Sequence, residues 1–393
     1  MKKSQENNNF ILFTLEYPPT KGGIASLYKS YADYWPEGDL AVLTDGEPLL
    51  IDSANIIRRP LLNKYLRPHW LPALWHLYKQ ISNFKFQTSP STSSGQANIH
   101  VLVGQILPLG QAIYYLSKLL KFKYSVLMHG LDFSLATGDK RKKKITDKIL
   151  KSADKIICSN SYTANSVKVF CPEFAAKLGM VNPGIESSFV RNPACVEELR
   201  AKYGLQSKLV LLSLGRLTKR KGADMVIKAM NEISGSAENL VYVIAGAGPE
   251  AEDLKKIASS LPEEIKNKII FLGQISDDDK WAWLELCDIF IMPSRDIAGD
   301  YEGFGIVYLE ANLAGKPVIA GDSGGVRDSV INNINGLLVN PENAQEITAA
   351  VIKLAADPEL RKALGEQGKR RAVENFNAKK QVEKLYNLMQ IRK

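Results

Sequence analysis

Two glutamates eight positions apart lie in a glycine-bearing motif late in the chain, Glu302-Gly303-Phe304-Gly305-Ile306-Val307-Tyr308-Leu309-Glu310. An irregular stretch (294–301) precedes the motif, and a helix is predicted to begin near Ile306. The two carboxylates are then about two helical turns apart and can point into one site. The glycines expose main-chain N–H groups, and the positive end of a helix favours a phosphate. An acidic helix start without a ligand is the plainer interpretation. Two further segments follow at once and favour a ligand-binding interpretation of the motif: Gly315-Lys316-Pro317 and Ser323-Gly324-Gly325.

A second candidate site follows a strand that is predicted to end at Leu214. The loop after it reads Gly215-Arg216-Leu217-Thr218-Lys219-Arg220-Lys221-Gly222. Open α/β sheets bind ligands beyond the carboxyl ends of their strands, where Arg216 would lie. Arg216 offers a planar fork and Lys221 a compact charge, so the two can act on the same phosphates. We expect Lys219 and Arg220 to be solvated.

Two further glycine-rich turns are weaker signals. In Glu16-Tyr17-Pro18-Pro19-Thr20-Lys21-Gly22-Gly23-Ile24-Ala25 a strand ends, and Gly22 and Gly23 precede a helix whose N–H groups could meet an anion. An ordinary strand-to-helix turn explains this segment equally well. Gly246-Ala247-Gly248-Pro249-Glu250 resembles a dinucleotide fingerprint but has Glu250 where the third glycine would stand. We assign it to a loop that faces the nucleotide.

The elements that would position these residues form two α/β series. Short apolar runs alternate with helical patterns, which indicates parallel sheets covered on both faces and two doubly wound domains. The predicted strands are Phe10–Leu15, Leu40–Thr44, His100–Val103, Ser125–Met128 and Lys155–Cys158, then Leu209–Leu214, Leu240–Ala245, Ile269–Leu272, Ile289–Met292 and Pro317–Ala320. Turn residues after Val181 mark the boundary. We predict domains over residues 1–185 and 186–375, and a C-terminal helical segment, 376–393, that packs on the first domain.

Charge is divided unevenly along the 393 residues. Residues 1–185 hold 23 Lys/Arg and 13 Asp/Glu, a net charge of +10, whereas the remainder holds 28 and 29. A basic half indicates an anionic partner surface, either nucleic acid or lipid, although a merely soluble basic surface is the plainer alternative. Two segments favour lipid. Lys140–Lys144 is a basic run, and Leu61–Phe86 mixes aromatic, leucine and basic residues with no acidic one. Ordinary core packing explains Leu61–Phe86 nearly as well, because Pro68 and Pro72 interrupt a long helix.

Location and redox state follow from smaller signals. No run of about 20 apolar residues exists, and the N-terminus is polar, so we expect no transmembrane helix and no secretory leader. The four cysteines form no CxxC pair, and we expect reduced thiols rather than zinc ligands. These features predict a cytoplasmic protein that associates peripherally with the inner face of the plasma membrane. We expect no nucleic-acid partner, because no recognised binding motif is present.

Taken together, these motifs resemble glycosyltransferase family four. The glutamate pair, the loop with Arg216 and Lys221, the Gly22-Gly23 turn and His129-Gly130 carry the resemblance, which extends over nearly the whole chain. It implies the GT-B fold, with two Rossmann-like doubly wound domains facing each other across a cleft, and a retaining mechanism. The likeness is greatest to bacterial mannosyl- and glucosyltransferases of lipid-linked glycan and exopolysaccharide synthesis. The chain departs from relatives at Val326-Arg327-Asp328, where Pro-Glu is common, and at Asp132, where several lipid-directed relatives have Glu.

The resemblance also implies roles for individual residues. Glu310 would hold the donor ribose, Arg216 and Lys221 the diphosphate, Glu302 the transferred sugar, and His129 that sugar near its 6-position. His129, Glu302, Arg216 and Lys221 form the catalytic set. The donor-binding set is Gly22, Gly23, Arg216, Lys221, Gly303, Phe304, Gly305, Ile306, Val307 and Glu310. Cations at the diphosphate would stabilise the charge on the leaving group.

We expect no metal and no cofactor. A metal-dependent glycosyltransferase of the other common fold needs an Asp-x-Asp motif, and the only match is Asp277-Asp278-Asp279. It follows Ser276 and opens a predicted helix, where acidic residues favour the dipole without any ligand. Arg216 and Lys221 would therefore take the place of a cation.

The predicted function is transfer of a hexose from a nucleotide-diphosphate sugar to a saccharide or lipid-linked saccharide in polysaccharide synthesis. UDP-glucose is the preferred donor, and GDP-mannose-dependent mannosyl transfer is the alternative. From a different class, a catalytically silent, membrane-associated nucleotide-sugar-binding protein would carry the same fold. The presence of all the charged positions that the chemistry needs argues for the enzyme.

Overall fold

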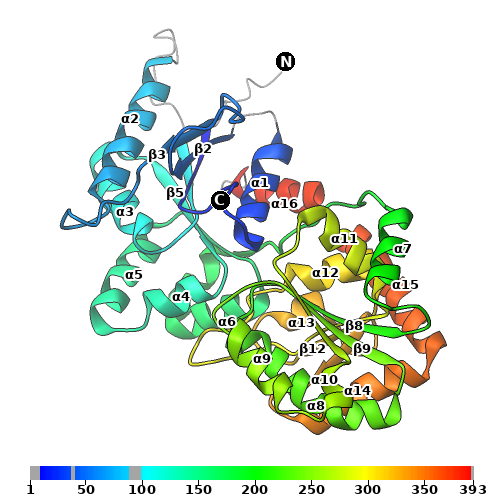
Figure 1. Cartoon of the computed structure of the whole chain (residues 1–393). Coiled ribbons are helices and arrows are strands. Elements are labelled where there is room, and N and C mark those ends of the chain that lie inside the picture. The colour runs from blue at the N-terminus through cyan, green and yellow to red at the C-terminus, as the bar shows by residue number, and fades with distance from the viewer. Residues whose placement is uncertain (1–8, 37–39, 88–98, 391–393) are drawn as a thin grey trace. The chain divides into compact units, whose positions relative to one another are not determined.

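The computed structural model describes residues 9–36, 40–87 and 99–390, and it divides into two compact units. One unit comprises Met1–Gly184 together with Lys379–Lys393, and the other comprises Ile185–Ala378. Both are α/β units in which all the described strands run parallel (Figure 1). The polar, low-complexity segment Thr88–Asn98, whose composition predicts a loop, lies outside the described residues.

The first unit contains a seven-stranded parallel sheet in the order β3-β2-β1-β4-β5-β6-β7. Its strands are β1 (Asn9–Thr14), β2 (Leu40–Asp45), β3 (Ile56–Arg59), β4 (Ile99–Val103), β5 (Lys123–Met128), β6 (Lys155–Cys158) and β7 (Leu178–Met180). Its helices are α1 (Gly23–Tyr34), α2 (Leu71–Gln87), α3 (Leu109–Leu120), α4 (Leu131–Ala136), α5 (Lys140–Ser152), α6 (Ser161–Phe170), the 3-10 helix η2 (Pro172–Lys177) and α16 (Ala378–Gln390).

Alternate side chains of each strand in this sheet enter two separate cores. On β1, Ile11 and Phe13 face a core that contains α2, α3 and α5, whereas Phe10 and Leu12 face a core that contains α1 and α16. This period of two is the ordinary pleat of a strand that is buried on both faces. The C-terminal helix α16 thus completes the first unit, where the Tyr386 ring lies 5.9 Å from that of Phe10.

The second unit contains a six-stranded parallel sheet in the order β10-β9-β8-β11-β12-β13. Its strands are β8 (Leu209–Leu214), β9 (Leu240–Ala245), β10 (Ile269–Gly273), β11 (Ile289–Met292), β12 (Val318–Gly321) and β13 (Gly336–Val339). Its helices are α7 (Pro193–Lys202), the 3-10 helix η3 (Lys219–Lys221), α8 (Ala223–Ser236), α9 (Ala251–Ser259), α10 (Glu263–Lys266), α11 (Asp277–Leu286), α12 (Ile306–Leu313), α13 (Val326–Ser329), α14 (Ala344–Ala356) and α15 (Pro358–Asn375).

Each sheet reverses its strand order once, between β1 and β4 in the first unit and between β8 and β11 in the second. At such a point the two connecting chains leave in opposite directions, and the carboxyl ends of the strands border a crevice that binds ligands. The loop with Arg216 follows β8, and the loop that leads to Glu302 follows β11. The topology therefore brings the two strongest sequence motifs to the same edge of the second sheet.

Within the described ranges, no helix is both long enough and apolar enough to span a bilayer. The four cysteines are free thiols, and Cys158 and Cys287 are buried. Pro72 does not interrupt α2, because it occupies the second position of the helix, where the missing N–H would have no intrahelical partner.

Two helical glycines in the second unit give a paired test of its packing. A Cβ at Gly365 on α15 would lie 2.1 Å from the Gly315 carbonyl oxygen, whereas a Cβ at Gly235 on α8 would meet nothing within 4 Å. We expect Gly365→Ala to lower the free energy of unfolding by about 2 kcal/mol through overpacking. Gly235→Ala should raise it by up to about 1 kcal/mol, because alanine favours the helix. Urea titrations measure both, and equal effects would contradict this account of α15.

Candidate donor site

The strongest feature of the candidate site is a buried carboxylate held by two cations. Glu302 is 8% exposed. Its Oε2 accepts a hydrogen bond from Arg220 Nη1 at 2.7 Å and pairs with Lys221 Nζ. Arg220 Nε also lies 3.0 Å from Asp300 Oδ1. Burial alone would raise the pKa of Glu302, but Lys221 and Arg220 hold it below its ordinary value, so this carboxylate stays ionised.

Arg220 is the one residue of this loop that the sequence analysis placed wrongly. We expected it to be solvated, yet its side chain is only 22% exposed and bridges Asp300 and Glu302. Its carbonyl oxygen also accepts a hydrogen bond from the Arg295 N–H at 2.8 Å. The partners lie 75 or more positions away, in the loop after β11, so no local pattern could reveal the contacts. Lys219, in contrast, is exposed, as expected.

Arg216 lies on the same loop but remains open to solvent. It follows Gly215, whose φ of 145° only glycine adopts readily. In the described part of the chain its guanidinium makes no hydrogen bond or ion pair, although its neighbours Arg220 and Lys221 are paired. Arg216 and the exposed Lys219 are therefore the cations of this loop that are available to an anionic ligand without breaking an existing contact.

The loop Gly246–Glu250 proves to be a packing partner of the Arg216 loop. A Cβ at Gly246 would lie 1.9 Å from the Gly215 carbonyl oxygen, and one at Gly248 would lie 2.2 Å from that of Leu217. The Leu217 N–H also donates to the Ala247 carbonyl oxygen at 2.9 Å. These contacts account for both glycines without a ligand, and they fix the backbone that carries Arg216.

The glutamate motif begins α12, and the close approach of two loops fixes its first residues. Gly305, with φ 77°, precedes the helix, and a Cβ there would lie 2.3 Å from the Tyr308 ring. The Gly325 N–H donates to the Glu302 carbonyl oxygen at 2.9 Å, and the Ser329 hydroxyl donates to that of Phe304 at 2.6 Å. The segment 323–329 thus braces the start of the motif.

Four residues of the motif differ in how far they meet solvent. Phe304 is buried and its ring packs on Phe376, whereas Gly303, Ile306 and Val307 are half-buried at the start of α12. Their position places main-chain N–H groups of the first helical turn at the carboxyl edge of the sheet, where orphan donors favour an anion.

Glu310 lies on α12 and has a cationic partner of its own. Lys280 Nζ on α11 lies 2.9 Å from Glu310 Oε1, and the two side chains are 23% and 18% exposed. The same ammonium group stands over the Trp281 ring, 4.9 Å from its centroid. A carboxylate accepts about four hydrogen bonds, so Glu310 retains acceptor capacity for a diol. Lys280 is a site residue that the sequence analysis missed.

Asp277, Asp278 and Asp279 form the first turn of α11. Ser276 caps the helix by accepting a hydrogen bond from the Asp279 N–H at 3.0 Å. Capping and the helix dipole account for these three carboxylates in this position.

The remaining predicted residues lie in the first unit, around the reversal point of its sheet. Tyr28 on α1 donates its hydroxyl proton to the Gly104 carbonyl oxygen at 2.9 Å and lies 2.7 Å from His129 Nε2. A hydroxyl has only one proton, so Nε2–H must be the donor to Tyr28, which leaves Nδ1 as an acceptor. Burial lowers the pKa of His129 to about 4, and the ring is neutral at pH 7.

Asp132 explains how the backbone at His129 is held. Its Oδ1 accepts hydrogen bonds from the His129 and Gly130 N–H groups, at 3.0 and 2.9 Å. Burial raises the pKa of Asp132 to about 6, and these backbone hydrogen bonds only partly offset that rise.

Gly22 and Gly23 lie exposed at the start of α1, and Gly22 has φ 147°. Nothing within 4 Å would meet a Cβ at Gly22, so backbone conformation alone requires glycine.

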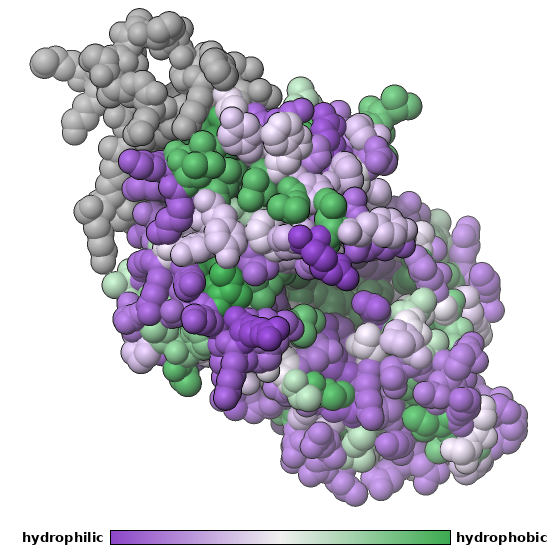
Figure 2. Space-filling view, turned by 90° about the vertical axis from the view of Figure 1, so that its left-hand side faces the viewer, coloured by the Kyte–Doolittle hydropathy of each residue, from purple (hydrophilic) through white to green (hydrophobic). Residues whose placement is uncertain are grey.

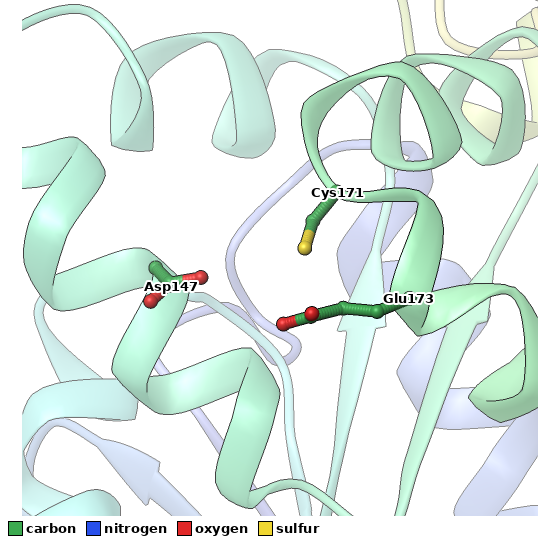
Figure 3. A group of neighbouring side chains, drawn as sticks. All are labelled: Asp147, Cys171 and Glu173. Carbon is green, nitrogen blue, oxygen red and sulfur yellow. The ribbon is translucent and has the colours of Figure 1, made fainter.

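A separate group of side chains has the composition of a metal site. Asp147 on α5, Cys171 just before η2 and Glu173 on η2 point toward one another (Figure 3). Lys151 Nζ lies 3.2 Å from a carboxylate oxygen of each acid. Burial and the neighbouring Glu173 raise the pKa of the Cys171 thiol, so it stays protonated. Because Lys151 neutralises both carboxylates, we assign no metal to this group.

Comparison with known proteins bears on the family and the fold of this chain. Residues 196–371 match the family of glycosyl transferases group 1. A "GDP-mannose-dependent alpha-(1-6)-phosphatidylinositol monomannoside mannosyltransferase" of Mycolicibacterium smegmatis is 34% identical over 60% of this chain and 62% of its own length. The protein of that name in Mycobacterium tuberculosis H37Rv is 36% identical over 55% and 56%. The matched region thus spans about three fifths of these curated relatives.

Solved structures show the fold over the whole chain. A glycosyltransferase of Rickettsia africae has a TM-score of 0.80 at 18% identity and covers 98% of this chain and 100% of its own. Anabaena HepE in complex with UDP has a TM-score of 0.75 at 16% identity, over 97% and 99%. The fold is GT-B, as predicted.

The Glu302 cluster gives a prediction for pH dependence. Because the pKa of Glu302 in the folded chain lies below its ordinary 4.5, the ion cluster contributes its full stability above pH 4.5. That contribution is lost as the pH falls through the lower folded value. Glu302→Gln should therefore cost about 3 kcal/mol at neutral pH, since it leaves Lys221 without its carboxylate and Arg220 with Asp300 alone, and less under acid conditions. Urea unfolding across this range measures the difference.

Glu252, exposed and paired with Lys255, supplies the control. Glu252→Gln should change the free energy of unfolding by less than about 1 kcal/mol. A loss for Glu302→Gln as small as that of the control would show that the buried cluster contributes no net stability.

Proposed function

We propose that this protein transfers a hexose from a nucleotide-diphosphate sugar. The premise is that residues 196–371 match the glycosyl transferases of group 1 and that the chain has the GT-B fold. The observation that carries the proposal is the cation set on the loop after β8, at the reversal point of the second sheet. Arg216 is unpaired there among the described residues, and Arg220 and Lys221 are held beside it by Glu302. Such a set suits a diphosphate.

The donor diphosphate would bind beside Arg220 and Lys221, whose charges Glu302 neutralises when no donor is bound. Arg216 would meet the phosphates first, and Lys221 and Arg220 would then share their charge between the phosphates and Glu302. As the bond to the sugar breaks, negative charge grows on the leaving diphosphate, and preorganised cations stabilise that charge. Freed in part from Lys221, the Glu302 carboxylate would accept hydrogen bonds from hydroxyls of the transferred sugar.

GDP-mannose is the donor that we propose. The sequence analysis preferred UDP-glucose and held GDP-mannose as the alternative, and the names of the relatives at 34–36% identity support that alternative. HepE binds UDP in its solved structure, but at 16% identity this likeness concerns the fold alone. The same relatives' names support a lipid-linked saccharide as the class of acceptor.

We propose that His129 contacts the transferred sugar, as the resemblance to glycosyltransferase family four implies. With Nε2 fixed by Tyr28, the unprotonated Nδ1 can accept a hydrogen bond from a sugar hydroxyl. We further propose retention of configuration without a divalent metal, with Arg216, Arg220 and Lys221 neutralising the diphosphate. An α-linked product from an α-linked donor, formed in excess EDTA and identified by NMR, tests this proposal. Inversion or strict metal dependence would refute it.

A donor panel tests the proposed substrate. We expect GDP-mannose to raise the melting temperature and to be hydrolysed or transferred, and UDP-glucose to do so less. The opposite order would restore UDP-glucose as the donor. Stabilisation by a nucleotide sugar without any turnover, across a panel of saccharide and lipid-linked acceptors, would favour the catalytically silent binding protein.

Glu310 gives a prediction for the ribose. Glu310→Gln should weaken nucleotide-sugar binding by about 1.5–3 kcal/mol, because a ribose diol would lose a charged acceptor. Titration calorimetry measures the affinity. Glu366→Gln, at an exposed position of α15, is the control and should leave it unchanged. Equal affinities for Glu310→Gln and the parent would remove Glu310 from the donor site.

A further inference from the structure

Three helices of the first unit lie side by side on one face of its sheet. Leu77 of α2, Leu116 of α3 and Ile149 of α5 enter the same core, and α3 packs against both of the other two (Figure 1, left). The opposite face of the sheet carries α1 and α16. The outer surfaces of α2, α3 and α5 therefore form one continuous face of the unit.

Helix α2 has an apolar stripe on each side. Ala73, Leu77 and Ile81 are fully buried against the sheet. Leu71, Trp75 and Tyr78, spaced four and three residues apart, form the outer stripe and are 40%, 52% and 38% exposed. Ordinary core packing thus explains only the inner stripe. A surface helix normally presents polar residues on its solvent side, so the outer stripe needs another explanation.

Helix α3 extends the exposed apolar surface. Tyr115 and Leu119, one turn apart, are 50% and 73% exposed. The Tyr115 ring stacks on that of Trp70, the residue before α2, with centroids 5.8 Å apart. On this side of the molecule hydrophobic, aromatic and hydrophilic side chains are interleaved (Figure 2).

Cations stand next to these rings. Lys79 Nζ lies 5.0 Å from the centroid of Trp75, and Lys118 Nζ lies 5.6 Å from that of Tyr114. The sequences of α2, α3 and α5 contain ten lysines and arginines and one acidic residue, Asp147, which pairs with Lys151. The 79 residues between Asp52 and Asp132 contain no acidic residue at all.

The fold gives no reason for the basic run at the start of α5. Lys140–Lys144 are all exposed in the first turns of the helix. Cations there oppose the helix dipole, which favours acidic residues at this end. Asp139 caps the helix but balances only one of the five charges. A partner that carries many negative charges would account for the run.

We propose that the outer face of α2, α3 and the start of α5 docks on an anionic lipid bilayer. Trp75, Tyr78 and the exposed leucines would enter the headgroup boundary, and Lys140–Lys144 would lie over lipid phosphates. Aromatic and apolar groups beside cations, with acidic residues absent over a long stretch, fit such a surface better than a protein partner. The proposal concerns a surface remote in sequence from the donor loops and does not rest on the proposed function.

Vesicle flotation tests the docking. At low salt the full chain should float with vesicles that contain phosphatidylglycerol and remain with the soluble fraction when the vesicles are phosphatidylcholine alone. Added salt should release it. Failure to bind the anionic vesicles, or equal binding to both kinds, would overturn the proposal and would indicate a protein partner or a solubility role for this face.

Matched charge variants assign the binding to this face. The triple variant Lys142→Gln, Lys143→Gln, Lys144→Gln should lower the partition coefficient about a hundredfold, since each basic residue near the surface contributes about fivefold. Lys362, Lys369 and Arg370, exposed on α15 of the second unit, provide a control with the same loss of charge. Equal losses in both triple variants would overturn the assignment to α5.

Matched apolar variants test insertion. The double variant Trp75→Ser, Leu119→Ser should weaken binding about tenfold, because it removes apolar area from the headgroup boundary. Val190→Ser with Ile331→Ser, at positions 90% and 42% exposed in the second unit, is its control. Brominated lipids should quench fluorescence of the parent chain more than that of Trp75→Phe. Equal quenching, with circular dichroism showing both chains folded, would refute insertion of Trp75.

Discussion

Parallel strands buried on both faces constrain where this protein can place polar groups. The strand residues are apolar almost throughout, so charged side chains can enter only where the strands end. At the carboxyl edge of the second sheet, the loops after β8 and β11 approach so closely that a Cβ at Gly222 would lie 2.2 Å from the Pro293 carbonyl oxygen. This approach brings Arg220 and Lys221 to Glu302, so the candidate site depends on the sheet that supports it.

The ion cluster would keep the proposed diphosphate site in order without its ligand. Two cations side by side repel each other, and an ionised carboxylate between them removes that repulsion while holding both side chains in place. The pKa of Glu302 stays low for the same reason. Arg216, exposed on the same loop, keeps the site attractive to anions although its neighbours are neutralised.

Local sequence was sufficient for the parts that local physics decides. The runs Leu209–Leu214 and Leu240–Ala245 are strands with the predicted bounds, because short continuous apolar segments bounded by turn residues favour a strand buried on both faces. Strands β3 and β13, which were not predicted, are short, and each lies at the edge of its sheet, where the pattern weakens. Arg220 and Lys280 could not be placed because their partners, Glu302 and Glu310, are distant in sequence. Those pairings exist only once the sheet has formed.

The return of α16 to the first unit has a consequence for synthesis on the ribosome. Val382, Leu385 and Met389 complete the core that α1 and β1 begin, so the first unit stays unfinished until the last of these residues has emerged. The second unit, Ile185–Ala378, has all its residues earlier and can fold first. The apolar side chains of α1 and β1 that α16 covers then stay uncovered while nearly two hundred residues are translated. A chaperone that shields exposed apolar surface would act during that interval.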